Sequence, residues 1–420
     1  MAALWLLVLV LVLLALRQNL LVILGTAVAY LYLFYTGDEL SYIVLDAWGA
    51  LNKEVLLSIP LFILAGNIMA RGGMALRLVR LVKALTGPVP GGLAIATVLS
   101  CAILAAISGS GTVTLLAVGA VMYPALLQAG YDKRFSLGAL TSAGTLGIIV
   151  PPSIPLILYG VMTQTSIADL FIAGLGPALL LTGLMAAYAV AVNWHRDRQP
   201  LVFAEVRQAA WHGVLALLMP VIILGGIYTG HFTATESAAV AVVYALLVEV
   251  LVHRQLGLKD VAEVMADTGR LLGGLFPVLM LALALNVFFT YQKVPEQLVE
   301  WLSGQIDSRI AFLLIVNVFL LIVGCIMDIG SAILILAPML MPLAVAQGID
   351  PVHFGIIMVV NLEIGYLTPP LGLNLIVALG AFRENFWLIC RAVVPFLFLM
   401  LAGLSVVSFW PELSLFLIDR

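Results

Sequence analysis

The chain has 420 residues, of which 63% are hydrophobic and only 10% charged, and its mean hydropathy is +1.18. These values lie far outside the range of soluble globular domains and predict an all-α polytopic membrane protein. A net charge of −3 with few, scattered basic residues gives no indication of a nucleic-acid partner, and the three cysteines lack the spacing of metal ligands.

A helix needs roughly 20 apolar residues to cross the hydrocarbon core of a bilayer. In chain order, the candidate spans are 1–16, 20–36, 55–70, 135–164, 171–193, 212–230, 236–252, 271–292, 352–380 and 387–409. The first resembles a signal-peptide core, but it lacks a basic N-terminal region and further spans follow, so we interpret it as a retained short span.

Two further apolar regions, 88–130 and 309–348, carry glycine, serine or aspartate at their centres and do not read as single spans. We expect each to form a re-entrant helical hairpin that enters and leaves the membrane on one side. The amphipathic runs 71–85 and 294–304 precede the two hairpins and are expected to be horizontal surface helices.

Alternating these segments from an outside N-terminus places 14 of the 19 Lys and Arg residues on the inner side. They are Arg17, Arg71, Arg77, Arg80, Lys83, Lys133, Arg134, Arg196, Arg198, Arg207, Arg254, Lys259, Arg270 and Arg383. The outer side holds Lys53, Lys293, Arg309 and Arg420, and Arg391 lies within a span. The tendency of inner loops to be positively charged supports this orientation.

Two segments repeat each other at an offset of 218 residues without a gap. The identical pairs are Pro124 and Pro342, Gly130 and Gly348, Asp132 and Asp350, Gly147 and Gly365, Pro151 and Pro369, and Pro152 and Pro370. In the topology above the copies enter the membrane from opposite sides, so we expect two inverted-topology repeats, the pattern of a secondary transporter. The predicted organisation is N-terminal spans and a surface segment (1–54), a first repeat (55–193), a linker with two spans (194–270), a second repeat (271–409) and a tail (410–420).

Each repeat carries a Pro-Pro pair inside a predicted span. Because proline has no amide hydrogen, each pair is expected to break its helix and to leave carbonyls without partners, near 147–149 in the first repeat. Sodium, a hard cation, would satisfy such carbonyls together with the hydroxyls of Thr145, Ser153 and Thr368. A proline kink repaired by neighbouring helices is the alternative at either pair, but two pairs at equivalent positions favour a binding site.

The centres of the hairpins, "ISGSGTVTLL" (107–116) and "IMDIGSAILI" (326–335), are expected to end one helix and to begin another. The free amides at the start of the second helix would attract a substrate carboxylate. Close packing of small residues is the alternative explanation. Asp328 is equivalent to Ser110, and since a charge deep in a membrane is costly, we expect Asp328 to be an ion ligand or a helix cap.

Other polar residues lie in or near these spans. Glu363 is either a proton or sodium site or a carboxylate satisfied by a neighbouring helix, and the sequence leaves both readings open. Asn67 and Asn374 are candidate polar contacts, whereas His231 and His353 lie near span ends and are expected at the membrane interface.

Four stretches are similar to one known family: "IPLFILAGNIMARGG" (59–73), "GTLGIIVPPSIP" (144–155), "GGIYTGHFTATESAAVAVVYAL" (225–246) and "GIDPVHFGIIMVVNLEIGYLTPPLGLNL" (348–375). They resemble the large membrane subunit of tripartite ATP-independent periplasmic (TRAP) transporters, and the likeness covers about 55–410. The resemblance implies a multi-pass protein of the bacterial inner membrane. It also implies two partners, a small membrane subunit on a separate chain and a periplasmic substrate-binding protein.

The same resemblance implies sodium-coupled uptake (symport) of a small organic acid, a C4-dicarboxylate or similar carboxylate, by an elevator-type transporter fold. The coupling ions would lie between the hairpin tips and the helix breaks. The predicted sodium-binding residues are Ser108, Gly109, Ser110, Thr112, Thr145, Gly147, Pro151, Asp328, Ser331, Asn361, Gly365, Thr368 and Pro369. The predicted substrate-binding residues are Ser110, Gly111, Pro152, Ser153, Gly330, Pro370 and Asn374. Sodium is the only metal expected.

A stand-alone sodium- or proton-coupled carrier of divalent organic anions is the alternative within transport. A channel is a second alternative, although broken helices in inverted repeats suit alternating access better. An intramembrane enzyme is the third. No histidine lies near Ser108 or Ser110 in the sequence and no aspartate in the first repeat matches Asp328, so we expect no catalytic residues.

Overall fold

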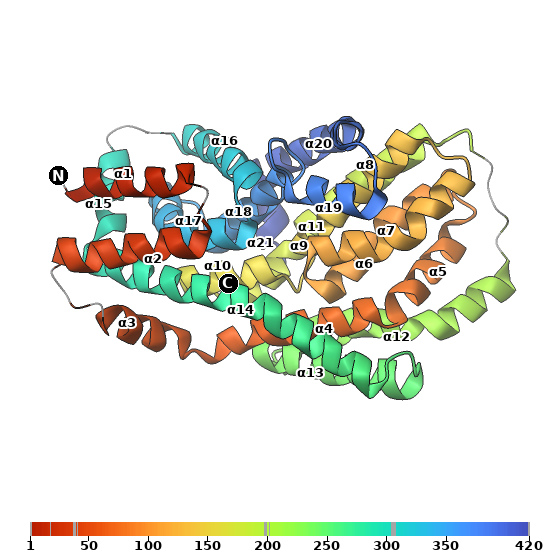
Figure 1. Ribbon diagram of the computed structural model, residues 1–420. Helices are drawn as coiled ribbons and strands as arrows, with labels where there is room; N and C mark the ends of the chain where they lie inside the picture. The colour runs from red at the N-terminus through yellow and green to blue at the C-terminus, as the bar shows by residue number, and fades with distance from the viewer. Residues whose placement is uncertain are drawn as a thin grey trace.

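The protein is described by a computed structural model that covers residues 2–16, 18–36, 39, 41–196, 200, 202–303 and 308–418. Within these residues it consists of helices and connecting segments, without strands (Figure 1). Met1, Arg17, Arg198, Gly304 and Arg420, which the sequence analysis used, lie outside the described residues.

The helices follow in this order: α1 (Ala2–Ala15), α2 (Leu20–Leu31), α3 (Ser41–Leu51), α4 (Ser58–Arg71), α5 (Met74–Thr86), α6 (Gly92–Ser108), α7 (Gly111–Gln128), α8 (Lys133–Gly144), α9 (Leu146–Ile149), α10 (Ile154–Thr163), α11 (Ile167–Val192), α12 (Phe203–Tyr228), α13 (Ala234–Leu246), α14 (Leu258–Tyr291), α15 (Val294–Ser303), α16 (Arg309–Ile326), α17 (Ile329–Ala346), α18 (Pro351–Gly365), α19 (Leu373–Phe382), α20 (Phe386–Phe409) and α21 (Glu412–Leu415). Two π-helical segments (Tyr32–Thr36 and Leu247–Val252) and one 3₁₀ helix (Glu54–Leu57) complete them.

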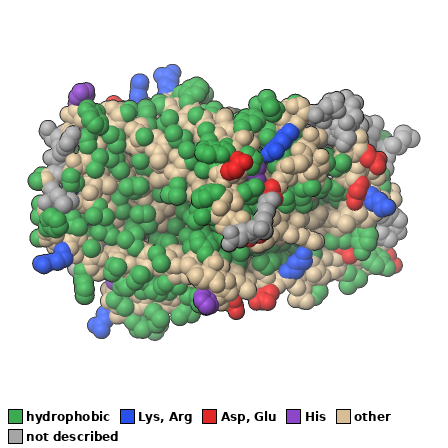
Figure 2. All heavy atoms as spheres, turned by 180° about the vertical axis from the view of Figure 1, so that it is seen from behind, with side chains coloured by type: hydrophobic (Ala, Val, Ile, Leu, Met, Phe, Trp, Pro, Cys, Tyr) green, Lys and Arg blue, Asp and Glu red, His purple; other side chains and the backbone are tan. Residues whose placement is uncertain are grey.

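Nine helices in the described part of the chain are long and apolar enough to cross a membrane, or ten if the bent α12 counts as one span. Figure 2 shows a face that hydrophobic side chains cover over most of its area. Such a surface suits contact with lipid rather than water, so the predicted class of polytopic all-α membrane protein is confirmed.

The predicted repeats are visible element by element. Helix α7 corresponds to α17 at an offset of 218 along its whole length, and α6 corresponds to α16 within one residue. Asp132 and Asp350 cap α8 and α18 at equivalent positions. Both Pro-Pro bonds are cis, and Gly130 and Gly348, with φ of 74° and 72°, take the left-handed conformation that glycine tolerates best. The two halves therefore share one local architecture, as the fold prediction requires.

One helix of each repeat packs on the hairpin of the other repeat at the centre of the molecule. Helix α10, which follows the first break, packs on α17 of the second hairpin, and α19, which follows the second break, packs on α7 of the first hairpin. In Figure 1 the first hairpin (α6, α7) lies on the right and the second (α16, α17) on the left. This exchange brings both tips and both breaks into one region.

A second group of helices runs along the lower edge of Figure 1, where α4 packs on α13 and α14, and α5 packs on α12. Helix α14 begins at Leu258, so the predicted boundary between linker and second repeat at 270/271 falls inside one continuous helix. The reason is composition: the run "LKDVAEVMADTGR" is charged and helical, and a search for apolar spans starts only after it.

Candidate functional site

The first break separates α8 from α10. Helix α8 ends at Gly144, a single turn (α9) follows, and Val150 is extended ahead of the cis Pro151–Pro152 bond. Ser153 then caps α10, because its hydroxyl accepts a hydrogen bond from the Leu156 amide at 3.4 Å. Since neither proline can donate, the carbonyls of Gly147 and Ile148 lose their helical partners, as predicted from the sequence.

The second break follows the same plan. Helix α18 ends at Gly365, the Pro369–Pro370 bond is cis, and α19 begins after Gly372, whose φ is 55°. The Thr368 hydroxyl donates to the Ile364 carbonyl at 3.2 Å. Both predicted interruptions are thus present, and each is followed by a short helix.

The tip of the first hairpin touches the first break backbone to backbone. A Cβ added at Gly147 would lie 2.5 Å from the Ser110 oxygen and 2.7 Å from the Gly111 nitrogen. A Cβ at Gly109 would lie 2.9 Å from the Pro152 oxygen, and Gly109 has a φ of 58°. Any side chain at these glycines would separate the tip from the break.

The second tip meets the second break in the same way. A Cβ at Gly365 would lie 2.5 Å from backbone atoms of Gly324, near the end of α16. The Ile329 amide donates to the Tyr366 hydroxyl at 2.7 Å, and the Ser331 amide donates to the Asp328 carboxylate at 2.8 Å. Asp328 is therefore the helix cap of α17, one of its two predicted roles.

The two tips differ in how their amides are satisfied. Asp328 and Tyr366 cap the start of α17, whereas Ser110 makes no side-chain cap to α7. The amides of Gly111, Thr112 and Val113 precede the first intrahelical bond of α7, from Thr114 to the Ser110 carbonyl. The start of α7 therefore retains the donors and the positive dipole end that attract an anion.

Most predicted hydroxyls already donate within the protein. Ser108 shares a hydrogen bond of 2.9 Å with Thr114, and Thr145 donates to the Ser142 carbonyl and faces the Met400 sulfur. A hydroxyl that donates one bond still has lone pairs for a cation, so these contacts are compatible with ion ligation. Ser110 and Thr112, at the tip itself, are partly exposed.

The sharpest polar feature is a buried group of the second repeat that faces the first. Glu363, Asn361 and Asn374 are completely buried. Asn374 donates to Glu363 Oε1 at 3.4 Å, and a Cβ at Gly111 would lie 3.5 Å from that same oxygen. Helix α18 packs on α9, α10 and α11 of the first repeat, and its Glu363 carboxylate thus lies beside the uncapped start of α7.

Several oxygens of this region have no hydrogen-bond partner among the described residues. They are Glu363 Oε2, Asn361 Oδ1 and Asn374 Oδ1 at the second break, and Thr141 Oγ1 and Ser142 Oγ just before the first. Leaving a buried acceptor unpaired is costly, and most of all for a carboxylate in a membrane. A proton or a bound cation would remove that cost. Thr141 and Ser142 were not predicted as site residues. The one sequence feature that could have indicated them is their position on the helix that leads into the break.

The described residues contain no group of three or more His, Cys, Asp or Glu side chains that could hold a metal ion together. The available ligands are backbone, hydroxyl and amide oxygens with single carboxylates. Such a set suits a hard alkali cation better than a transition metal, which favours imidazole and thiolate.

The second tip and the second break lie at the surface of the described structure, where Asp328, Pro369 and Pro370 are exposed. The first break, in contrast, is buried from Thr145 to Ser153. The two equivalent breaks therefore differ in access within one conformation.

His353 lies in the first turn of α18, near a span end as expected, and it is completely buried because α16, α20 and α21 pack around α18. His231, in contrast, is exposed in the loop before α13. Asn67 donates to Thr268 at 3.0 Å and so connects α4 with α14.

Comparison with known proteins identifies what the chain is similar to. The family model described as the DctM component of the tripartite ATP-independent periplasmic transporter matches residues 7–413. The C4-dicarboxylate TRAP transporter large permease protein DctM of Pseudomonas aeruginosa is 39% identical over 400 residues, which cover 93% of this chain and 92% of the relative. The ectoine/5-hydroxyectoine TRAP transporter large permease protein UehC of Ruegeria pomeroyi is 36% identical over 100% of this chain and 98% of its own length.

Among solved structures, the YdaH transporter of Alcanivorax borkumensis, described as having an unusual topology, matches with a TM-score of 0.65. The match covers 89% of this chain and 88% of that one at 16% sequence identity. This likeness concerns the fold alone, and it agrees with the arrangement of helices described above.

Proposed function

Because this chain belongs to the family of DctM components of tripartite ATP-independent periplasmic transporters, and is thus a multi-pass permease of the bacterial inner membrane rather than an enzyme, we propose a sodium-driven uptake function. In this proposal the protein is the large permease subunit through which a sodium gradient drives the uptake of a small organic acid. Its partners are a small membrane subunit and a periplasmic binding protein that delivers the acid.

The observation that carries the proposal is the position of Glu363 beside the uncapped start of α7. The free amides attract a substrate carboxylate, but the Glu363 carboxylate repels it. A cation bound by the unpartnered oxygens of Glu363 and Asn374 would cancel that repulsion. Binding of the ion would then favour binding of the acid, which is the coupling that symport needs.

The packing also supports an elevator motion. Each tip is locked to a break through glycines, and each break is followed by a helix that packs on the opposite hairpin, so these elements form one unit. That unit meets α4 through a contact between Gly66 and Ser108, where a Cβ would lie 2.9 Å from the Ser108 oxygen. Helix α5 packs on α6 and α12, and α15 packs on α17 and α14, so both helices connect that unit to the group of helices around α4.

The identity of the acid is proposed only as a class. The relatives above are named for C4-dicarboxylates in one case and for ectoines in the other, which differ in size and charge. All these solutes carry at least one carboxylate, the group that the start of α7 would bind. A C4-dicarboxylate is the narrower candidate, and it rests on the similarity to the Pseudomonas protein.

Uptake by the reconstituted protein tests the proposal. Liposomes containing this chain and the small subunit, with binding protein outside, should accumulate a labelled organic acid only when sodium is higher outside. Uptake without a sodium gradient would contradict sodium coupling. Uptake by this chain alone would favour the stand-alone carrier of divalent organic anions.

Glu363→Gln separates the role of the carboxylate from the rest of the site. Glutamine keeps the hydrogen-bonding shape but removes the charge that a cation would neutralise. We expect the sodium concentration for half-maximal uptake to rise by tenfold or more, while the protein remains in the membrane. Unchanged sodium dependence would remove Glu363 from the ion site. Asn67→Leu, whose contact lies between α4 and α14, serves as the control.

A further inference from the structure

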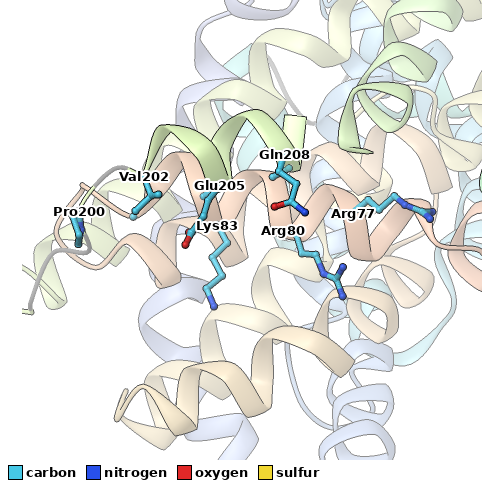
Figure 3. A pocket seen from close by; sticks show the side chains of 10 residues that line it. Arg77, Arg80, Lys83, Pro200, Val202, Glu205 and Gln208 are labelled. Atoms are coloured by element: carbon cyan, nitrogen blue, oxygen red, sulfur yellow. The ribbon is translucent and has the colours of Figure 1, made fainter. Parts of the chain in front are cut away.

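A basic cavity at the predicted inner surface is separate from the transport site. Its volume is about 510 Å³, and it lies between α5 and the start of α12. Figure 3 shows Arg80 and Lys83 of α5 extended toward the same side, below Gln208 and Glu205 of α12, with Arg77 farther along α5. Among the described residues, three cations and one carboxylate line it, so the charge of this part of the lining is positive.

These cations are not neutralised by neighbours. Within the described residues, none of the three forms an ion pair with a carboxylate within 4.0 Å. The Arg77 Nη1 atom is buried and has no hydrogen-bond partner in the described part of the chain. That nitrogen lies against Gly73 at the start of α5, so Arg80 and Lys83 are the cations available to an anion in the cavity.

The surroundings favour a lipid as the source of that anion. Phe203 and Trp211 on α12 are 80% and 81% exposed, and Leu85 at the end of α5 is 51% exposed. Aromatic residues of this kind gather where a membrane meets water, while lysine and arginine extend to the headgroups. The apolar side chains offer contact to acyl chains beside a cavity that fits a headgroup.

We propose that this cavity binds the phosphodiester headgroup of an anionic phospholipid of the inner leaflet. Arg80 and Lys83 bind the phosphate oxygens, and the exposed apolar side chains of α5 and α12 contact the acyl chains. Arginine suits this role because its planar fork matches two phosphate oxygens. The bound lipid would link α5, the helix that leads into the first hairpin, to α12.

Mass spectrometry of the intact detergent-solubilised protein, titrated with phosphatidylglycerol, tests the site. Each basic residue near an anionic lipid surface contributes roughly a fivefold gain in binding, so Arg80→Gln with Lys83→Gln should weaken binding roughly 30-fold. Glu205→Gln removes the opposing charge and should strengthen binding, which keeps the test decisive if the double variant folds poorly. Arg134→Gln with Lys259→Gln removes two exposed cations elsewhere and should leave binding unchanged.

Several outcomes would overturn the proposal. Equal binding of phosphatidylglycerol by the wild type, the double variant and Glu205→Gln would show that the cavity does not recognise the lipid. Saturation of the cavity by inorganic phosphate, with protection against phosphatidylglycerol, would make it a site for a small free anion. Loss of the small subunit from the purified complex of the double variant, with lipid binding unchanged, would make this surface a protein interface. Preference for zwitterionic phosphatidylcholine would also contradict it.

Discussion

At the scale of the residue, the site depends on glycines that let two backbones touch. Gly147 lies against Ser110 and Gly111, and its counterpart Gly365 lies against Gly324. Gly147 and Gly365 are one of the identical pairs of the sequence repeat, and Gly111 and Gly324 are residues that they contact. The structure gives the physical reason for these glycines: a side chain at either position would hold the tip away from its break.

Gly147→Ala is expected to abolish sodium-dependent uptake. The added Cβ would approach backbone atoms that cannot move aside singly, and overpacking of this kind costs about 1–3 kcal/mol. Thermal unfolding together with uptake measures both effects. Gly183→Ala, where an added Cβ would meet nothing within 4 Å, is the matched control and should behave as wild type. Normal uptake by the Gly147 variant would show that the tip contact is dispensable.

Asp328 allows capping and ion binding to be separated. Asparagine is as good a helix cap as aspartate, whereas alanine loses the cap at a cost of roughly 1 kcal/mol. If the carboxylate acts as a cap, Asp328→Asn keeps both thermal stability and sodium affinity, and only Asp328→Ala loses stability. A drop in sodium affinity for Asp328→Asn at unchanged stability would instead make the carboxylate an ion ligand. We expect the first result, because the carboxylate bonds both the amide and the hydroxyl of Ser331.

At the scale of the element, a buried carboxylate caps the start of α5 and holds it in place by hydrogen bonds. Glu249, in the π-helical segment after α13, accepts from the amides of Gly73 and Met74 at 2.9 and 2.7 Å, and its side chain is completely buried. This cap ties the helix that leads into the first hairpin to the group of helices around α13.

Glu249→Ala is expected to lower stability by about 1–2 kcal/mol, because two buried amides lose their acceptor. Thermal unfolding of the purified protein measures the loss. Glu249→Gln keeps one acceptor oxygen and should lose less. An alanine variant as stable as wild type would show that water replaces the carboxylate without cost.

A second connection between elements is centred on Glu384, which lies in the loop between α19 and α20. Lys133, at the start of α8, bonds Glu384 in the loop before α20 at 2.7 Å, and Tyr123 of α7 donates to the same carboxylate at 2.9 Å. The hydrogen bond from Lys133 holds the pKa of the Glu384 carboxyl below its usual range. Both side chains are partly exposed, so the contribution to stability is small.

The sign of this contribution gives a pH dependence. Because the folded pKa of Glu384 is lowered, its stabilisation is present above the usual glutamate pKa and is lost as pH falls through the folded value. Glu384→Gln should therefore lower the melting temperature slightly at neutral pH and remove part of its decline in acid. Glu300→Gln, an exposed position on α15, should leave the pH profile unchanged. A variant with the wild-type acid profile would exclude a role for Glu384.

At the scale of the whole molecule, the repeat made the fold predictable. Prolines and glycines at one offset marked the breaks and the turns between hairpin and broken helix, because these residues act on the backbone locally. Helix boundaries and exposure were harder to predict where charged residues occur. The polar first part of α14 was not predicted, because a search for spans detects only apolar segments. The exposure of Asp328 depends on how the helices pack and not on the residues next to it in the sequence.

The candidate site was predictable only within each repeat. The sequence pointed to the tips and the breaks, but not to the approach of Glu363 to Gly111, which belong to different repeats. That contact arises because α18 packs on α9, α10 and α11 of the first repeat, and no local pattern encodes which half a helix will pack against. The same holds for His353, whose burial depends on α16, α20 and α21.

The central claim is that a hairpin tip and a helix break together hold the ion that drives transport. Equilibrium binding of radiolabelled sodium to the purified protein measures this directly. We predict saturable binding by the wild type and by Gly183→Ala, loss of that binding in Gly147→Ala, and binding at least tenfold weaker in Glu363→Gln. Wild-type sodium binding by both of the latter variants would contradict the account.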